Sequence, residues 1–252
     1  MHTKYRKSKV LFSFLLLFTL TISIPAIFAQ TPALDQSDSL YKQSKSKQEY
    51  DKIALQIEKI LEDNPNLNLH EWKWRLARVY YALAKNFEES RVHHYDQCIL
   101  LSSQAIELKS NSAISYFYRG LCRGKKGELK GIWASLGIID PFEEDMKKAV
   151  SLDPTVNHSG PHRALGKLYL ELPFFLGGDF DKSEFHFMES IRLAPDFAEN
   201  HLGLAQVLMK KNKSTKARET LHKLMQLTDN TQDEKLLSLR KEGLELLEEL
   251  SP

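Results

Sequence analysis

Few side chains in this sequence have a type and spacing that could support catalysis. It contains no Gly-x-Ser-x-Gly, His-Glu-x-x-His or Cys-x-x-Cys motif, so common hydrolase, zinc-protease and dithiol patterns are missing. The run from Gly120 to Lys126 differs from a phosphate-binding loop, because three residues instead of four separate Gly120 from Gly124 and no Ser or Thr follows the lysines. We therefore predict no catalytic residue, no nucleotide site and no cofactor.

Two histidine pairs and one acidic run could also act chemically. His93 and His94, like His158 and His162, have no Cys or carboxylate at metal-ligand spacing, and each pair is expected in a turn. We interpret both pairs as solvated and predict no metal site. The acidic run Glu143–Asp145 falls in the first turn of an expected helix, where negative charge favours the helix dipole. We therefore predict that the protein is not an enzyme.

A repeated helical pattern must position any binding residues. Five segments share it, at 58–65, 103–110, 147–154, 188–195 and 222–229. Their fourth position is always apolar, and their eighth is proline in three of them, which marks a helix end. The spacings are 45, 44, 41 and 34 residues. The last is the period of the tetratricopeptide repeat (TPR), a pair of helices.

Upstream amphipathic stretches supply the first helix of four hairpins, at 69–84, 113–125, 161–172 and 197–210. The pattern predicts an all-α, TPR-type helical-hairpin solenoid over residues 50–230, closed by a capping helix over 231–252. Residues 30–49 are either a flexible lead-in or a poor first helix, and we assign a weak helix. Capping boxes are expected at Asn68, Asp140, Asp181 and Thr231, each with a glutamate three residues later.

Two lengthened turns are expected inside the repeats, at 124–140 and 171–179, with Pro141 starting the helix after the first. They carry Trp133, Phe174 and Phe175, where a minimal repeat has a short polar turn. Apolar side chains in such turns either fold over the array or offer a contact surface.

The concave surface of such an array is lined by the first helix of each hairpin. Aromatic residues there either fill the core or form an apolar groove with a basic edge, suited to an elongated apolar or amphipathic ligand or to a partner's helix. Our hypothesis is that Trp74, Tyr81 and Phe117 form its floor and that Arg78 and Arg163 contact an anionic end. The remaining positions predicted to face the groove are Leu121, Lys167, Leu170, Leu202, Gln206 and Met209.

The first 29 residues have the pattern of an export signal. Four basic residues precede an apolar run from Val10 to Phe28, and we predict cleavage after Ala29. An uncleaved membrane anchor is the alternative, because the run approaches the roughly 20 residues that a spanning helix needs. The 35 basic residues less these four leave 31, against 33 acidic residues. With no basic face rich in aromatics, nucleic acid is not an expected partner.

The sequence has two cysteines, Cys98 and Cys122. Neither directly follows the apolar run, so lipid attachment is not expected. We interpret them as two small, unpaired, buried helix residues. A disulfide stays open as the alternative, because the repeat register puts them on neighbouring helices and an exported protein meets oxidising conditions.

Two stretches resemble a known family: WRLARVYYALA at 74–84, and the block from His158 to Phe197 that contains GPHRALGKLY and PFFLGGD. They are similar to the T-component of TRAP (tripartite ATP-independent periplasmic) transporters and to the related regulators of microtubule dynamics. The resemblance covers roughly 70–229. It implies a periplasmic helical array with an apolar groove or pore, an oligomer, and contact with a transporter's solute-binding component. A general adaptor for envelope assembly, without a small ligand, is the alternative. Members are commonly lipoproteins, whereas this chain lacks the lipid-accepting cysteine.

Overall fold

The computed structural model describes residues 25–64, 68–130 and 132–250, and this part of the chain is helical and contains no strand. The predicted signal lies mostly outside it, in residues 1–24. No helix in the described ranges is both long and apolar enough to cross a bilayer. The elements are α1 (Pro25–Gln43), α2 (Lys47–Asp63), α3 (Leu69–Asn86), α4 (Arg91–Leu108), α5 (Ala113–Lys130), α6 (Ile132–Leu152), α7 (Val156–Glu171), a 3-10 turn (Phe174–Leu176), α8 (Phe180–Leu193), α9 (Ala198–Lys210), α10 (Ser214–Leu227) and α11 (Glu234–Glu249).

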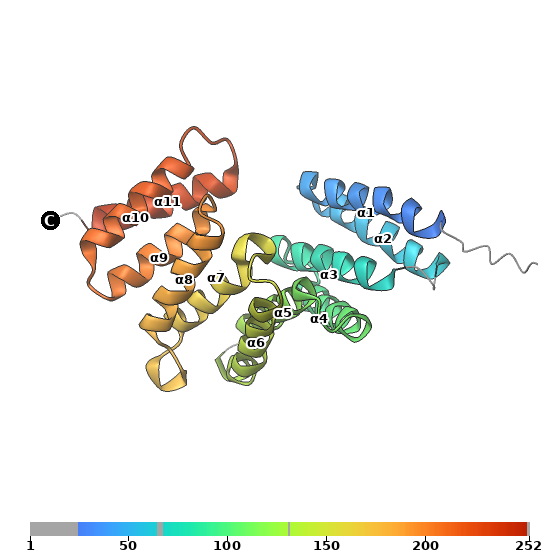
Figure 1. Cartoon of the computed structure of the whole chain (residues 1–252), viewed down its shortest axis with the longest axis horizontal. Helices are drawn as coiled ribbons and strands as arrows, with labels where there is room; N and C mark the ends of the chain where they lie inside the picture. The colour runs from blue at the N-terminus through green and yellow to red at the C-terminus, as the bar shows by residue number, and fades with distance from the viewer. Residues whose placement is uncertain (1–24, 65–67, 131, 251–252) are drawn as a thin grey trace, which may run out of the picture.

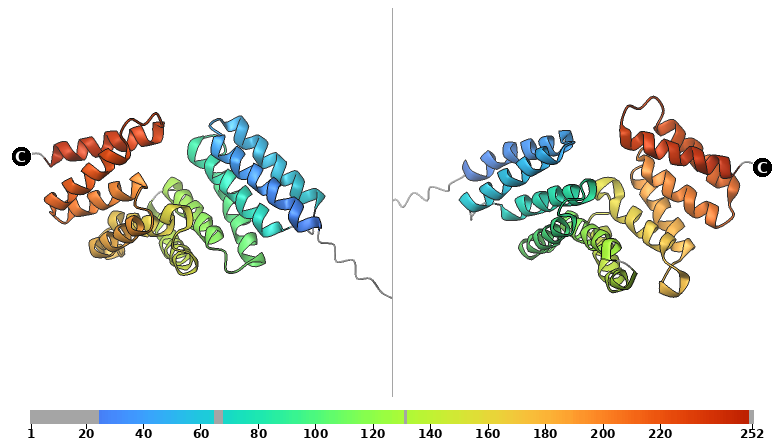
Figure 2. Two further views of the ribbon diagram at one scale, coloured as in Figure 1. Left: turned by 45° about the horizontal axis from the view of Figure 1, so that its top comes forward. Right: turned by 180° about the vertical axis from the view of Figure 1, so that it is seen from behind.

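The helices pack as consecutive hairpins, and the predicted TPR-type array is confirmed. Each odd-numbered helix contacts the next odd-numbered one, so α1, α3, α5, α7, α9 and α11 form a continuous inner layer. The array curves, and its two ends lie on the same side of the bend around α5–α7 (Figures 1 and 2). Helix α11 packs against α9 and α10 at the C-terminal end, as expected of a capping helix.

Helix caps differ from the four predicted capping boxes. The box occurs instead at Ser46, whose hydroxyl accepts from the Glu49 N–H while the Glu49 carboxylate accepts from the Ser46 N–H. Asn68 precedes α3 but makes no side-chain cap, and Asp140 lies inside α6. The carboxylates of Asp179 and Asp233 cap α8 and α11, replacing the predicted caps Asp181 and Thr231.

The expected turn at 124–140 is wrong, because the extra residues lengthen both helices of the hairpin. Pro141 lies inside α6 instead of starting it. Glycines on one face of α5 allow the close approach: a Cβ on Gly124 would lie 2.9 Å from Cδ2 of Phe142, and one on Gly127 2.9 Å from Cδ1 of Ile138. Gly120 and Gly124, the glycines compared above with a phosphate-binding loop, therefore serve helix packing, as does Gly127.

The acidic run near 143–145 is also in the middle of α6 and not in a first turn. Asp145 is buried, and its carboxylate accepts hydrogen bonds from Arg119 at 2.6 Å and Arg123 at 2.8 Å, both on α5. Because removing the partners of a buried carboxylate leaves an uncompensated charge, these two ion pairs hold α6 against α5 within the third hairpin. The helix-dipole interpretation is therefore wrong for Asp145.

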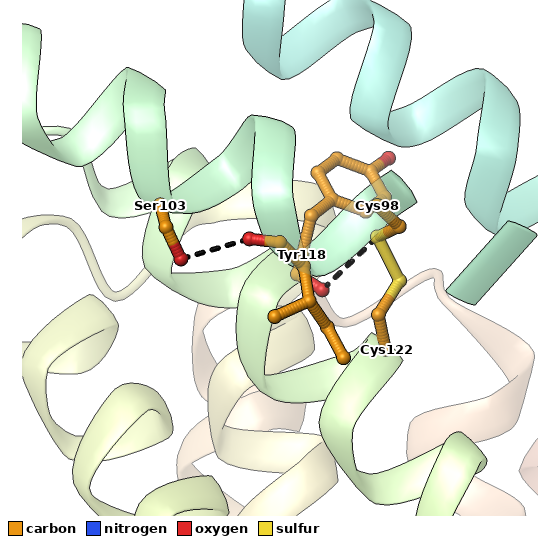
Figure 3. The surroundings of a disulfide bond; sticks show 5 residues. Cys98, Ser103, Tyr118 and Cys122 are labelled. Atoms are coloured by element: carbon orange, nitrogen blue, oxygen red, sulfur yellow. Dashed lines mark hydrogen bonds between the residues drawn. A yellow bond between two sulfur atoms is a disulfide. The ribbon is translucent and has the colours of Figure 1, made fainter. Parts of the chain in front are cut away.

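Cys98 of α4 and Cys122 of α5 form a disulfide, so the interpretation as unpaired cysteines is wrong (Figure 3). The bond joins the second hairpin to the third, and both cysteines are fully buried. The carbonyl oxygen of Tyr118 lies 3.6 Å from Sγ of Cys98. Since a disulfide sulfur carries no proton, this is a packing contact and not a hydrogen bond.

Candidate binding surface on the inner helices

The inner layer carries the residues predicted to face a groove, but they differ in exposure. Phe117 is only 2% exposed and Leu202 only 6%, and both belong to the hydrophobic core. The groove role expected for these two side chains is therefore corrected to a packing role. Tyr81, Leu121, Leu170, Gln206 and Met209 are half-buried, and Lys167 is exposed.

Helix α1 covers the part of the inner face that contains Trp74 and Arg78. Arg78 is 8% exposed and donates to Asp38 of α1 at 2.6 Å, while its guanidinium lies 4.0 Å from the ring centre of Tyr41. Arg75 donates to the same carboxylate at 2.8 Å and stacks on Trp74 at 4.2 Å. Asp38 thus neutralises the charge of Arg78. The predicted contact of Arg78 with an anionic ligand is corrected to an ion pair within the fold.

Arg163 of α7 lies at the centre of the inner face. Its Nε is 3.3 Å from Oε2 of Glu199 on α9, and its Nη1 donates to Oδ1 of Asn200 at 2.9 Å. Lys235 of α11 lies 2.5 Å from the other oxygen of Glu199. Burial lowers the pKa of Arg163, and the Glu199 charge opposes that shift. One carboxylate therefore bridges two cations from different helices.

An aromatic pair flanks this centre. The Phe197 ring lies 4.5 Å from the Arg163 guanidinium and stacks on the His158 ring at 4.7 Å. His158 belongs to three consecutive left-handed residues, Asn157 to Ser159, with φ between 51° and 57°. Such a run is strained for residues other than glycine. It brings the His158 carbonyl to 3.0 Å from Nη1 of Arg163.

Two more lysines bring positive charge to the same region. Part of the Lys85 side chain is exposed, yet burial lowers its pKa, and the charges of Lys235, Lys125 and Arg163 lower it further. Glu199 opposes them. Lys125 pairs with Glu128 at 2.7 Å, whereas Lys85 has no ion-pair partner within the described ranges. Four cations therefore meet two carboxylates, Glu128 and Glu199, and the centre carries more positive than negative charge. We call Lys85, Lys125, Arg163 and Lys235 the basic centre.

A cavity of about 240 Å³ lies between α5, α6 and α7, and Leu121 and Lys167 both line it. Lys125 belongs to this lining and to the basic centre. Glu128, Lys167 and Glu171 have more than half of their side chains exposed, so this part of the lining reaches solvent. The apolar walls are Leu121, Ile138, Ile139, Phe142, Ala164, Leu168 and Leu172.

Two of the predicted loop residues, Phe174 and Phe175, do not line this cavity. Phe174 is 92% exposed and Phe175 82%, on the 3-10 turn between α7 and α8. Trp133 is on α6, so it is not on a loop, and its side chain lies outside the described part of the structure. Because the two phenylalanines contribute almost nothing to the core, they offer an apolar contact surface.

His162 is buried, so the solvated-turn interpretation is wrong for it. Its Nδ1 lies 2.9 Å from Nδ1 of His186 on α8, and Tyr169 stacks on His186. His94 is also mostly buried, with its ring beside Tyr80. No cluster of three or more metal-ligating side chains occurs within the described residues.

The fold and this inner face define a TPR-type helical repeat protein, a class that is typically non-catalytic. The chain belongs to the family described as regulator of microtubule dynamics protein 1-3, whose family model matches residues 33–169, more than half of the sequence. The TRAP transporter T-component model matches residues 130–240. Both matches confirm the resemblance predicted from the sequence, and neither indicates an enzyme family.

Solved structures with the same fold include TTC0263, a thermophilic TPR protein of Thermus thermophilus. It has a TM-score of 0.64 at 18% identity, covering 86% of this chain and 98% of that one. The MamA RS-1 ArsTM double mutant has a TM-score of 0.53 at 12% identity, covering 79% and 94%. An assembly chaperone of RpL4, Acl4, has 0.52 at 13%, covering 87% and 88%. These likenesses show the fold alone. No curated protein sequence matches this chain significantly.

Four members of the central arrangement, Lys85, Lys125, Glu199 and Lys235, were not predicted from the sequence to lie there. Lys85 follows Tyr81 by four residues and so shares its helix face, a signal that helix periodicity contains. Glu199 lies in the first turn of α9, and Lys235 lies on α11, the helix predicted only to cap the array. Their convergence depends on the curvature of the array.

Proposed function

We propose that the protein is an exported, non-catalytic binding protein whose inner face holds an amphipathic segment of a partner protein. The observation that carries the proposal is the apolar cavity between α5, α6 and α7, which shares Lys125 with the basic centre. The apolar side of the segment enters the cavity. Its acidic side pairs with Lys85, because Lys85 lies among cations without a carboxylate partner in the described ranges.

Export is supported by three independent features. The N-terminal sequence has a basic region and an apolar run, the family match includes a periplasmic transporter component, and Cys98 is paired with Cys122. Structural disulfides persist in oxidising compartments such as the periplasm and are rare in the cytosol. N-terminal sequencing of protein from the envelope fraction is expected to start at Gln30. Intact Met1 in a membrane pellet would indicate the anchored form.

The partner we propose first is the solute-binding component of a TRAP transporter, because the T-component model matches residues 130–240. The second candidate function is a general envelope assembly adaptor. The exposed Phe174 and Phe175 favour it, since they offer an apolar docking surface separate from the cavity. A third candidate ligand is an apolar small molecule bound in the cavity. Native mass spectrometry of the purified protein would detect it.

Two variants test the inner face. Ala164→Trp fills the cavity, and Lys85→Glu reverses the unpaired charge, whereas Lys216→Glu makes the same charge change at an exposed site on α10. We expect the first two to lose binding of anilinonaphthalene sulfonate, an amphipathic anion, and capture of the purified solute-binding component. Lys216→Glu should keep both. Light scattering on the same samples measures the oligomer that the family resemblance implies.

The outcomes separate the candidate functions. Equal dye binding by wild type, Ala164→Trp and Lys85→Glu would show that the inner face is not a binding site. If the wild-type protein binds the dye but does not capture the solute-binding component, the inner face remains a binding site and the proposed transporter partner is wrong. Loss of capture only after Phe174→Ser and Phe175→Ser would favour the adaptor surface.

A further inference from the structure

An uncharged turn projects from the array between α7 and α8. It comprises residues 172–178, and we call it the apolar turn. Two of its side chains, Phe174 at 92% and Phe175 at 82%, are the most exposed large apolar side chains in the described part of the chain. The apolar turn and the end of the α5–α6 hairpin point to the same edge of the array (Figure 1). Exposed aromatic rings of this kind indicate a contact surface.

The backbone holds the apolar turn in one conformation. The amides of Leu176 and Gly178 both donate to the Pro173 carbonyl oxygen, at 2.9 and 3.0 Å. Gly177 has a φ of 96°, which favours glycine, and a Cβ on Gly178 would lie 1.8 Å from the carbonyl oxygen of Leu172. The two rings are therefore displayed on a preformed turn, which loses little conformational entropy when it binds.

The inner-face cavity between α5, α6 and α7 suits such a ring. Its walls are apolar, and Leu172, which lines it, is also the first residue of the apolar turn. An apolar cavity of about 150 Å³ holds one benzene molecule. The 240 Å³ of this cavity therefore has room for one phenylalanine ring and part of a second. The exposure of Phe174 and Phe175 shows that they do not fill the cavity of their own chain.

A second copy of the chain supplies both parts of this contact. Because the apolar turn directly follows the helix that lines the cavity, the rings and the cavity adjoin each other on one surface. A two-fold axis can then place the turn of each copy in the cavity of the other. The same patch is used on both sides, as in most homodimers.

The charges beside the apolar turn are compatible with a second copy. Three ion pairs within one chain neutralise them: Lys167 with Glu171, Lys182 with Asp179, and Lys211 with Asp181. Two identical surfaces of this kind approach without like-charge repulsion. The pairs also leave no excess positive charge among residues 167–182 to hold the turn against an anionic lipid surface.

We propose that two copies of the chain associate by exchanging the apolar turn, so that Phe174 and Phe175 of each copy enter the cavity between α5, α6 and α7 of the other. The second copy and the amphipathic segment of a partner protein then exclude each other from the cavity. Self-association thereby regulates access to the inner face. This regulatory consequence rests on the proposed function, because both occupants use the same cavity.

Sedimentation velocity over a series of protein concentrations measures the self-association. Phe174→Ser/Phe175→Ser removes the rings, and Ala164→Trp fills the cavity. Each change should weaken the dimer at least about thirtyfold, as expected when an aromatic anchor or its pocket is lost. Phe185→Ser/Met188→Ser removes two other exposed apolar side chains, on α8, and should leave the dimer unchanged. A dimer of wild-type strength in Ala164→Trp would overturn the proposal.

Mixing the two weakened variants distinguishes a lost contact from a misfolded protein. Phe174→Ser/Phe175→Ser keeps an open cavity, and Ala164→Trp keeps its rings, so a mixed pair has one intact contact. We expect the two variants to associate with each other, more weakly than wild type does, although neither associates with itself. Failure of the mixture to associate, while both variants melt as wild type does, would contradict the exchange.

Dye binding keeps this inference apart from the proposed function. Lys85→Glu does not alter the cavity lining, so it should lose anilinonaphthalene sulfonate and still dimerise. If all variants bind the dye equally while the dimer responds as expected, the proposed function fails and the exchange stands. If wild type stays monomeric while Ala164→Trp and Lys85→Glu lose the dye, the exchange is wrong and the proposed function stands. Binding of monomeric wild type to phosphatidylcholine vesicles, lost in Phe174→Ser/Phe175→Ser, would assign the rings to a bilayer and also overturn the exchange.

Discussion

The ring of Phe187 on α8 packs so closely against Gly166 on α7 that a Cβ there would lie 2.9 Å from Cδ2 of the ring. Gly203 of α9 meets the opposite edge of the same ring. Phe187 is 2% exposed, so the ring fills the junction between the fourth and fifth hairpins. The two glycines therefore leave the space that this ring occupies.

Replacing Gly166 with leucine should destabilise this junction. Overpacking a filled core costs about 1–3 kcal/mol, so we expect the melting temperature to fall by several degrees. Gly137→Leu is the matched control, because Gly137 is exposed on α6 and a Cβ added there would have nothing within 4 Å. Equal thermal unfolding curves for Gly166→Leu and Gly137→Leu would contradict the assigned crossing.

Reducing the disulfide should lower stability without changing the fold. Cys98 and Cys122 are 24 residues apart, and closing a loop of this length contributes roughly 3–4 kcal/mol by chain entropy. We expect a lower denaturant midpoint in the presence of a phosphine reductant. The double variant Cys98→Ala/Cys122→Ala should show no such dependence. Detection of two free thiols in denatured, unreduced protein would contradict the pairing.

The same substitution at two phenylalanines should change the unfolding free energy by very different amounts. Phe117→Ala removes a buried core ring and should cost about 3–5 kcal/mol of unfolding free energy. Phe174→Ala alters an exposed ring and should change it by less than about 0.5 kcal/mol. Denaturant titration of both variants measures the difference. If the Phe117→Ala protein were as stable as the wild type, Phe117 would not be a core residue and its predicted groove role would stand.

Acidification should destabilise the fourth hairpin through His162 and His186. Burial lowers the pKa of both from about 6.5, and with the neighbouring charges it brings the pKa of His186 to about 4. The unfolded chain then binds more protons than the folded one, so stability is highest above pH 6.5 and is lost as the pH falls towards 4. The loss is on the order of 1–3 kcal/mol, allowing for partial exposure.

Unfolding free energies at pH 7 and pH 5 measure this effect. The double variant His162→Gln/His186→Gln should lose most of the difference between the two values. His222→Gln, at an exposed site on α10, should retain it. The same pH dependence in all three proteins would show that the pair is not its source.

The helical hairpins could be predicted from the sequence because apolar periodicity reports which face of each helix is buried. The stretch predicted at 69–84 is α3, Leu69–Asn86, and that predicted at 197–210 is α9, Ala198–Lys210. Helix ends were predicted less well where glycine was involved. In the sequence alone, Gly124 and Gly127 indicate a turn. In the structure both lie within α5, where their lack of a side chain lets Phe142 and Ile138 of α6 pack closely.

Helix register alone could not assign the inner-face roles. Phe117 and Trp74 were both predicted to form the groove floor. Phe117 is part of the core, whereas Trp74 stacks with Arg75, whose charge is neutralised by Asp38 of α1. Asp38 lies 40 residues before Arg78, and Lys235 lies 150 residues after Lys85. Local pattern carries no information on such pairs, because their distance depends on small packing angles summed over every hairpin between them. The sequence by itself therefore determined the repeat and its faces, whereas the curvature of the array decided which cations meet.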